Sequence, residues 1–318
     1  MNRFFSRPRP TLVETVVKCF QDRFLLRADE RLNARLLGCL AKAQQEYDVE
    51  LHGFVCLSNH LHILASYEDP QHMADFHRHL NGNLSKEVGK LRDWRGALFS
   101  GRYGHVEISD EPEAQWQRLK YLLSQGCKEG LVASPLDWPG ASSVTSMVSG
   151  EPLVGEWIDR TALHRARQRG EDVSERDFVE YLEVTLRPIP SLAHLSEAEY
   201  RRVVLALVGQ IEEETAAMHH ENGTRPAGAA AVLSRDPLGC PAERKPRRSR
   251  PWFHAVAPEV RETMRAAMIY MVVAYREAAS RLKGGDRLVE FPLHTFPPGL
   301  PFVKRMVPLE DIVTLKPG

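Results

Sequence analysis

The chain has 318 residues and a mass of 36.0 kDa, a length typical of about two domains. Lys plus Arg and Asp plus Glu each number 42, so the formal net charge is zero, which excludes a uniformly basic nucleic-acid-binding surface and leaves only local basic patches. The longest apolar run has 10 residues, fewer than the about 20 that span a bilayer, and the five scattered cysteines favour neither a disulfide framework nor a thiolate zinc site. We therefore expect a cytoplasmic protein with no membrane partner.

The first 145 residues read as a mixture of strands and helices in a regular order. The composition and spacing of apolar residues predict strands over 11–17, 49–57 and 60–65 and an extended segment over 97–108. Apolar residues at helical spacing predict helices over 30–47, 73–91 and 112–125. This order predicts an α+β fold in the N-terminal half: a small antiparallel sheet with helices on one face, of the HUH or ferredoxin-like kind, and its other face open.

Past Trp138-Pro139 the composition changes. Residues 171–214 carry 11 acidic and 4 basic side chains, whereas residues 240–283 carry 10 basic and 4 acidic ones. We expect a domain over 1–145, a helical acidic extension over 146–220, a linker with a basic cluster over 221–252, and a helical, basic segment over 253–318. The basic cluster includes Arg247 and Arg248, which either contact a nucleic-acid backbone or belong to a solvated linker.

The most distinctive local feature is the segment Ser58-Asn-His-Leu-His62. Side chains alternate between the two faces of a strand, so His60 and His62 share one face. Two imidazoles in this arrangement can hold one divalent ion. They can equally be a pair of hydrogen-bonded histidines, and the motif alone does not decide between the two.

The helix predicted over 112–125 presents a tyrosine away from its own apolar stripe. At about 100° per residue, Trp116, Leu119 and Leu122 lie on one side of the helix, and Tyr121 lies roughly opposite. Gln125, four residues on, stands on the tyrosine's face. Tyr121 is then either a half-exposed residue that packs on a neighbour or a nucleophile beside a metal, with the Gln125 amide oxygen as a third ligand.

Together, these two features resemble the IS200-like family of single-tyrosine, HUH-type transposases, which includes the REP-associated tyrosine transposases. The family's His-hydrophobic-His motif matches His60-Leu-His62, and its tyrosine helix, Tyr-Ile-x-x-Asn-Pro-x-x-x-Gly, matches the segment that starts at Tyr121. Its Asp-Trp-Pro-Trp-Ser-Ser signature matches residues 137–143. The resemblance covers about residues 10–145, and the chain departs from it at Gln125-Gly126 and at Gly140.

The resemblance implies a DNA transposase that acts as an endonuclease and strand transferase on single-stranded DNA with hairpin or short palindromic ends. Tyr121 would form a 5′-phosphotyrosine, and His60, His62 and Gln125 would hold Mg²⁺ or Mn²⁺. The chemistry is consistent with this, because a free phenol has a pKa of about 10 and needs help to attack a phosphodiester. We expect a monomer or homodimer associated with the nucleoid.

Basic residues that precede the tyrosine helix are further candidates for DNA contact. They are Lys86, Lys90, Arg95 and Arg102, with aromatic residues interleaved. Cations can follow a backbone while aromatic faces stack unpaired bases. The alternative is a solvated helix end with core aromatics.

Two other functions fit part of the pattern. The altered Asn-Pro position is consistent with a domesticated relative that binds hairpin or single-stranded DNA without cleaving it. A metal-dependent hydrolase of the amidohydrolase kind also begins with His-x-His after a strand, but it requires an eightfold βα alternation that the sequence does not show.

Overall fold

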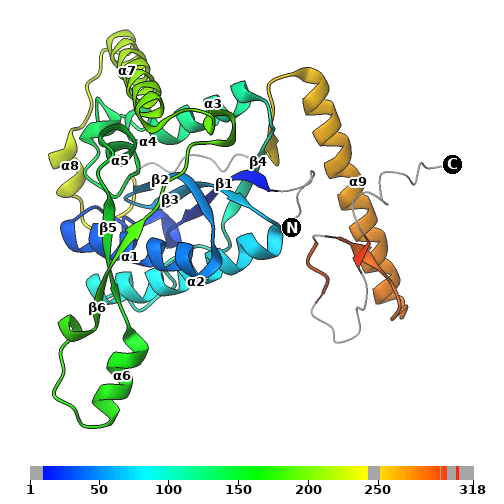
Figure 1. The fold of residues 1–318 in the computed structure, drawn as a ribbon, viewed down its shortest axis with the longest axis horizontal. Coiled ribbons are helices and arrows are strands. Elements are labelled where there is room, and N and C mark those ends of the chain that lie inside the picture. The colour runs from blue at the N-terminus through cyan, green and yellow to red at the C-terminus, as the bar shows by residue number, and fades with distance from the viewer. Residues whose placement is uncertain (1–9, 243–250, 294, 299–305, 308–318) are drawn as a thin grey trace.

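The computed structural model describes residues 10–242, 251–293, 295–298 and 306–307, and Figure 1 shows their arrangement. Arg247 and Arg248 lie outside the described residues. Within the described residues, no helix is both long and apolar enough to cross a membrane.

A five-stranded sheet forms the centre of the N-terminal part, in the order β2-β3-β1-β4-β7. The strands are β1 (Thr11–Lys18), β2 (Glu50–Leu57), β3 (His60–Tyr67), β4 (Gly104–Ile108) and the short β7 (Phe253–His254). The first four pair antiparallel, as predicted, and β7 adds a parallel edge next to β4. An open, mainly antiparallel sheet rules out the βα barrel that the hydrolase alternative requires.

Helices α1 (Glu30–Tyr47) and α2 (Pro70–Leu91) cover one face of this sheet. Asp29 and Asp69 cap their first turns by accepting hydrogen bonds from backbone N–H groups. The apolar residues Val13, Phe54 and Ile63 project into this layer. The core there is continuous and buried.

The opposite face is also covered, in contrast to the open face that the sequence predicts. Helix α3 (Pro112–Leu123) lies on it, followed by α4 (Gln125–Lys128), α5 (Val144–Ser149) and the long α7 (Glu197–Glu221). The reason is that the strands are apolar on both sides: Leu12, Leu64 and Val106 form a second core with α3 and α7. The fold class is the predicted α+β, with helical layers on both faces.

The segment 146–220, predicted to be helical, also contains a β-hairpin. Strands β5 (Leu153–Ile158) and β6 (Val179–Val184) pair antiparallel, with α6 (Arg160–Gln168) between them. The hairpin packs against α1 through two glycines, since a Cβ on Gly38 would lie 2.2 Å from the Glu156 backbone and one on Gly155 would lie 2.0 Å from Gly38 N. Short 3₁₀ helices lie at Phe20–Asp22, Pro135–Asp137, Glu175–Phe178 and Pro190–Leu192.

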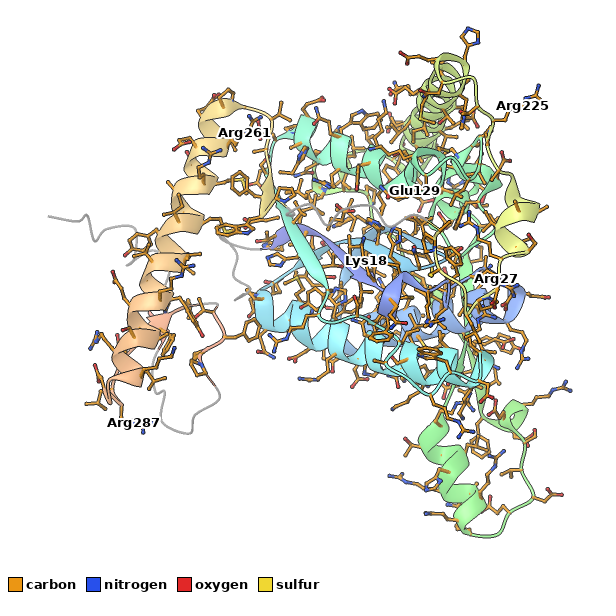
Figure 2. The ribbon with its side chains drawn as sticks, turned by 180° about the vertical axis from the view of Figure 1, so that it is seen from behind. Lys18, Arg27, Glu129, Arg225, Arg261 and Arg287 are labelled. Carbon is orange, nitrogen blue, oxygen red and sulfur yellow. The ribbon has the colours of Figure 1, made fainter. Side chains whose placement is uncertain are left out.

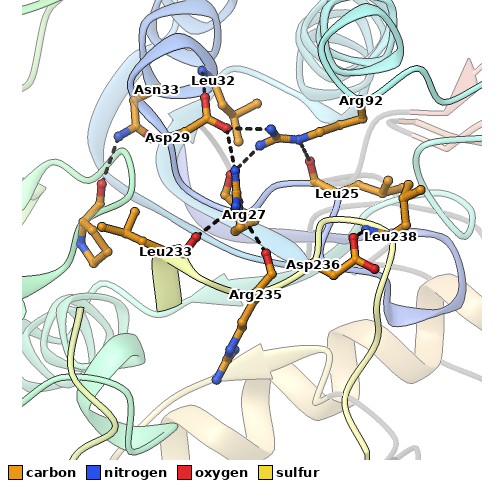
Figure 3. A network of polar contacts seen from close by, with 11 residues as sticks. Leu25, Arg27, Asp29, Leu32, Asn33, Arg92, Leu233, Arg235, Asp236 and Leu238 are labelled. Carbon is orange, nitrogen blue, oxygen red and sulfur yellow. Dashed lines mark hydrogen bonds and ion pairs between the residues drawn. The ribbon is translucent and has the colours of Figure 1, made fainter. Parts of the chain in front are cut away.

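The C-terminal part returns to the N-terminal sheet. Helix α8 (Ala229–Leu233) precedes a segment that lies along the loop before α1 (Figure 3). There Arg27 donates to the carbonyl oxygens of Leu233 and Arg235, and Asp29 binds both Arg27 and Arg92. Beyond β7, helix α9 (Pro258–Lys283) runs along one side of the molecule, with the short strands β8 (Phe291–Pro292) and β9 (Met306–Val307) beside it.

Candidate active site

The two histidines of the sequence motif lie side by side on β3, on the face that α3 covers. Their ring centroids are 4.9 Å apart with an interplanar angle of 61°. The turn before the strand helps to orient the first ring, since His60 Nδ1 lies 2.7 Å from Asn59 Oδ1. The predicted juxtaposition of His60 and His62 is therefore present.

The second histidine is bound by an acidic residue that the sequence analysis does not identify. His62 Nδ1 lies 2.7 Å from Glu14 Oε1, and the two side chains are 5% and 2% exposed. On β1, Val16 stands opposite His62 and Glu14 opposite Leu64, so Glu14 is a diagonal neighbour of His62 on the same face. The isolated acid in the apolar strand 11–17, on the histidine face, was the signal that could have revealed it.

A third charged group completes this contact. Arg118 Nη1 on α3 donates to Glu14 Oε2 at 2.7 Å. Burial alone would raise the pKa of Glu14, but the hydrogen bonds and charges of His62 and Arg118 outweigh burial and lower it. Glu14 is therefore a carboxylate that bridges two donors in the interior.

Tyr121 reaches this cluster from α3. Its ring centroid lies 6.2 Å from that of His62, in an edge-on arrangement. Two cations lie over the same ring: the Arg118 guanidinium carbon at 5.0 Å and Lys128 Nζ at 4.3 Å from the centroid. The phenol of a helix and the imidazoles of a strand thus meet within one chain, and Tyr121 faces away from the buried Leu119 and Leu122 as predicted.

Gln125 is the first residue of α4, directly after the break at Ser124 that separates it from α3. Its side chain is buried, and its amide nitrogen donates to the Tyr121 carbonyl oxygen at 2.7 Å. This bond leaves the amide oxygen as the atom with which Gln125 would bind a metal.

The imidazole nitrogens of His60 and His62 and the amide oxygen of Gln125 are ligand types that suit a divalent ion. Both imidazoles use Nδ1 for contacts within the protein, so both would bind a metal through Nε2. The Glu14 carboxylate behind His62 is the outer contact that commonly orients a metal-binding histidine. Within the described residues, no three or more His, Cys, Asp or Glu side chains are arranged so that they could hold a metal ion together, so the two histidines with Gln125 are the ligands to consider.

The glycines at the two departures from the transposase motifs, Gly126 and Gly140, both pack against Trp138. A Cβ on Gly126 would lie 3.1 Å from the Trp138 ring, and one on Gly140 would lie 2.6 Å from Trp138 Nε1. Trp138 Nε1 donates to the Cys56 carbonyl oxygen at 3.0 Å, which ties this segment to β2. Glycine at both positions allows the indole to lie over the end of the tyrosine helix.

The basic residues predicted to contact DNA lie in different places. Lys86 and Lys90 are exposed on α2, which covers the sheet face opposite to Tyr121, and Lys90 Nζ lies 3.6 Å from Glu175 Oε1. Arg95 and Arg102 are exposed in the segment between α2 and β4. The structure thus brings His60, His62 and Tyr121 together, places Gln125 against the Tyr121 backbone, and leaves Lys86 and Lys90 on the other layer.

Pockets lie on both sides of the cluster. One, of about 490 Å³, is lined by His60, by Lys18 and Glu129, both labelled in Figure 2, and by Arg235 and Cys240 of the C-terminal part. The other, of about 620 Å³, lies beside Tyr121 between α3 and α7. Its walls include Arg118, Lys120 and Lys128, and, from the C-terminal part, Glu214, Met218 and His254.

Comparisons with known proteins give the following matches. Residues 13–125 match the sequence model of the family described as IS200-like transposases. A solved structure of a REP-associated tyrosine transposase bound to a REP hairpin is 16% identical, with a TM-score of 0.37, and the match covers 48% of this chain and 87% of that one. A crystal structure described as that of a proposed transposase from Deinococcus radiodurans R1 is 19% identical, with a TM-score of 0.27, and the match covers 37% of this chain and 95% of that one. No curated protein sequence matches the chain.

Proposed function

We propose, from the match of residues 13–125 to the IS200-like transposase family, that the protein cleaves and rejoins single-stranded DNA through Tyr121. The observation that carries the proposal is the 6.2 Å between the Tyr121 and His62 ring centroids. Residues far apart in the sequence meet there, as a metal-assisted tyrosine nucleophile requires.

The reaction would proceed by in-line substitution at phosphorus. The Tyr121 hydroxyl oxygen forms a bond to phosphorus, the bond from phosphorus to the 3′ oxygen breaks, and one strand leaves with a free 3′-OH. The other strand stays on the enzyme as a 5′-phosphotyrosine, so a second 3′-OH can reverse the step without ATP. Hairpin or palindromic ends are the substrate that the family membership suggests.

His60, His62 and Gln125 would hold Mg²⁺ or Mn²⁺. When bound there, such an ion would supply Lewis-acid chemistry, polarising a phosphoryl oxygen and stabilising charge on the leaving 3′ oxygen. Two neutral imidazoles and an amide do not cancel the charge of the ion, which favours an anionic substrate. Arg118 and Lys128, over the Tyr121 ring, add positive charge at the place where the phosphate must lie.

The C-terminal part would contribute to the same site. Met218 and Thr215 of α7, and His254 of β7, line the pocket beside Tyr121, although all three lie outside the matched residues 13–125. We propose that this part bounds the space in which the DNA strand lies. For the exposed Arg95 and Arg102 we propose contacts with more distant stretches of the substrate.

The proposal is tested by trapping the covalent intermediate. The full chain is incubated with Mn²⁺ and labelled single-stranded hairpin DNA from the flanks of its own gene, and the products are separated under denaturing conditions. We expect a protein–DNA adduct that Tyr121→Phe and a chelator abolish. Tyr181→Phe, at a tyrosine that is 72% exposed on β6, is the matched control and should form the adduct normally.

The outcomes separate the remaining alternatives. Hairpin binding without any adduct, in wild type and Tyr121→Phe alike, would support the domesticated binding protein. Cleavage that persists in Tyr121→Phe would contradict the choice of nucleophile.

A further inference from the structure

One buried carboxylate joins the three elements that make the site. Glu14 on β1 contacts His62 Nδ1 on β3 through Oε1 and Arg118 Nη1 on α3 through Oε2, each at 2.7 Å. The three side chains are 2%, 5% and 11% exposed, respectively, so solvent screens these contacts little. A buried acid is costly unless hydrogen bonds satisfy it, and here both oxygens are used.

The arginine carries this connection to the nucleophile. Arg118 and Tyr121 are three residues apart on α3 and therefore neighbours on the helix surface. The guanidinium carbon lies 5.0 Å from the centre of the Tyr121 ring. An arginine whose guanidinium is held by Glu14 has few rotamers left, and the ring that packs against the same guanidinium is restricted in turn.

We propose that Glu14 is a positioning residue that fixes both the orientation of the metal-binding His62 imidazole and the position of the Tyr121 ring. Accepting the Nδ1–H of His62 fixes the tautomer in which Nε2 carries the lone pair, and accepting from Arg118 fixes the cation against the Tyr121 ring. The first half of the inference rests on the proposed metal site, and the second half rests on the proposed cleavage by Tyr121. Its first half, the effect on metal binding, holds for the protein whether or not it cleaves DNA.

The informative substitution is Glu14→Gln, which keeps the size of the side chain. An amide offers one oxygen and one NH₂ group, whereas the site presents two donors, so glutamine can accept from His62 or from Arg118 but not from both. Loss of an outer carboxylate typically weakens metal binding by about 10–100-fold. We expect a loss in that range for Mn²⁺, measured by titration calorimetry on the full chain without DNA.

The matched control is Glu87→Gln. Glu87 is likewise a buried carboxylate, and Arg160 binds both of its oxygens at 2.7 Å, but it lies on α2 beyond the opposite sheet face. Both substitutions remove a buried charge pair, so both should lower the unfolding temperature. Only Glu14→Gln should weaken Mn²⁺ binding.

Two further measurements separate positioning from folding. Nitrogen-15 NMR of the metal-free protein should show His62 protonated at Nδ1 in wild type and a mixture of tautomers in Glu14→Gln. Arg118→Lys, which keeps the positive charge but not the planar guanidinium, should bind Mn²⁺ as wild type does. It should nevertheless form the DNA adduct about 100-fold more slowly at saturating Mn²⁺, because a misplaced nucleophile is slow.

The results that would overturn the proposal are specific. Wild-type Mn²⁺ affinity in a folded Glu14→Gln protein, or an equal loss of affinity in Glu87→Gln, contradicts the positioning role. If wild type binds Mn²⁺ with the expected dependence on Glu14 but forms no adduct, the proposed cleavage function fails while the role of Glu14 in metal binding stands.

Discussion

Two ionisable side chains, Glu14 and His52, are buried in the interior of the protein. His52 is 1% exposed and lies where the register of β2 shifts against β3. Its Nδ1 lies 2.9 Å from the Pro188 carbonyl oxygen, and its Nε2 lies 2.8 Å from Ser66 Oγ. Burial lowers the pKa of His52, although its contacts with backbone carbonyl groups oppose the shift.

This lowered pKa makes stability depend on pH in a defined direction. Below about pH 6.5 the unfolded chain protonates His52 while the folded protein resists it, so the free energy of unfolding falls as the pH falls, by at most about 1.4 kcal/mol per pH unit for this group. Above that pH the effect is absent. We expect the stability advantage of wild type over His52→Gln to shrink between pH 7 and pH 5, measured by urea unfolding. A constant difference over that range would contradict the prediction.

At the scale of elements, close backbone approaches decide how the layers fit. The β5–β6 hairpin meets α1 at Gly38 and Gly155, and the end of the tyrosine helix meets Trp138 at Gly126 and Gly140. Strands and helices of the first 125 residues follow from apolar periodicity, and the structure contains them close to the predicted bounds. The hairpin does not follow from it, because residues 159–178 separate its two strands and both strands pack against the distant helix α1.

Gly140→Ala tests the packing of Trp138. The added Cβ would lie 2.8 Å from the Cys56 carbonyl oxygen and would disturb the hydrogen bond that Trp138 donates to it. We expect a loss of about 1–3 kcal/mol in the free energy of unfolding. Gly209→Ala is the control, since nothing lies within 4 Å of its Cβ position in the middle of α7, and we expect it to be neutral or to stabilise by about 0.5–1 kcal/mol. Equal effects at the two sites would contradict this account.

At the scale of the whole molecule, the C-terminal part folds back over the N-terminal sheet. Arg92, at the end of α2, donates to the Arg27 carbonyl oxygen in the loop before α1, and Arg27 donates to the carbonyl oxygens of Leu233 and Arg235, as Figure 3 shows. Lys120 of α3 donates to Glu214 of α7 at 2.5 Å. Glu111 accepts from the backbone N–H groups of Val256 and Ala257, which holds the start of α9. The pocket beside Tyr121 therefore has walls from both parts of the chain.

Met218→Trp tests whether the substrate enters that pocket. Met218 is partly buried and lines the pocket, so an indole there would reduce its volume of about 620 Å³. We expect adduct formation with single-stranded hairpin DNA to fall by about tenfold or more, with Mn²⁺ affinity unchanged. Ala217→Trp, at an exposed neighbour on α7, should have no effect. Normal adduct formation by Met218→Trp would show that the DNA lies elsewhere.

The sequence by itself determined the α+β class, most elements of the first 125 residues, and the placing of His60 and His62 on one face of a strand, because periodicity and strand alternation are local. Only the tertiary structure decided that both sheet faces are covered and that the C-terminal part borders Tyr121. It also decided that Glu14 stands between His62 and Arg118. These contacts join residues on separate elements, and their positions depend on strand register and helix packing, which no local pattern encodes.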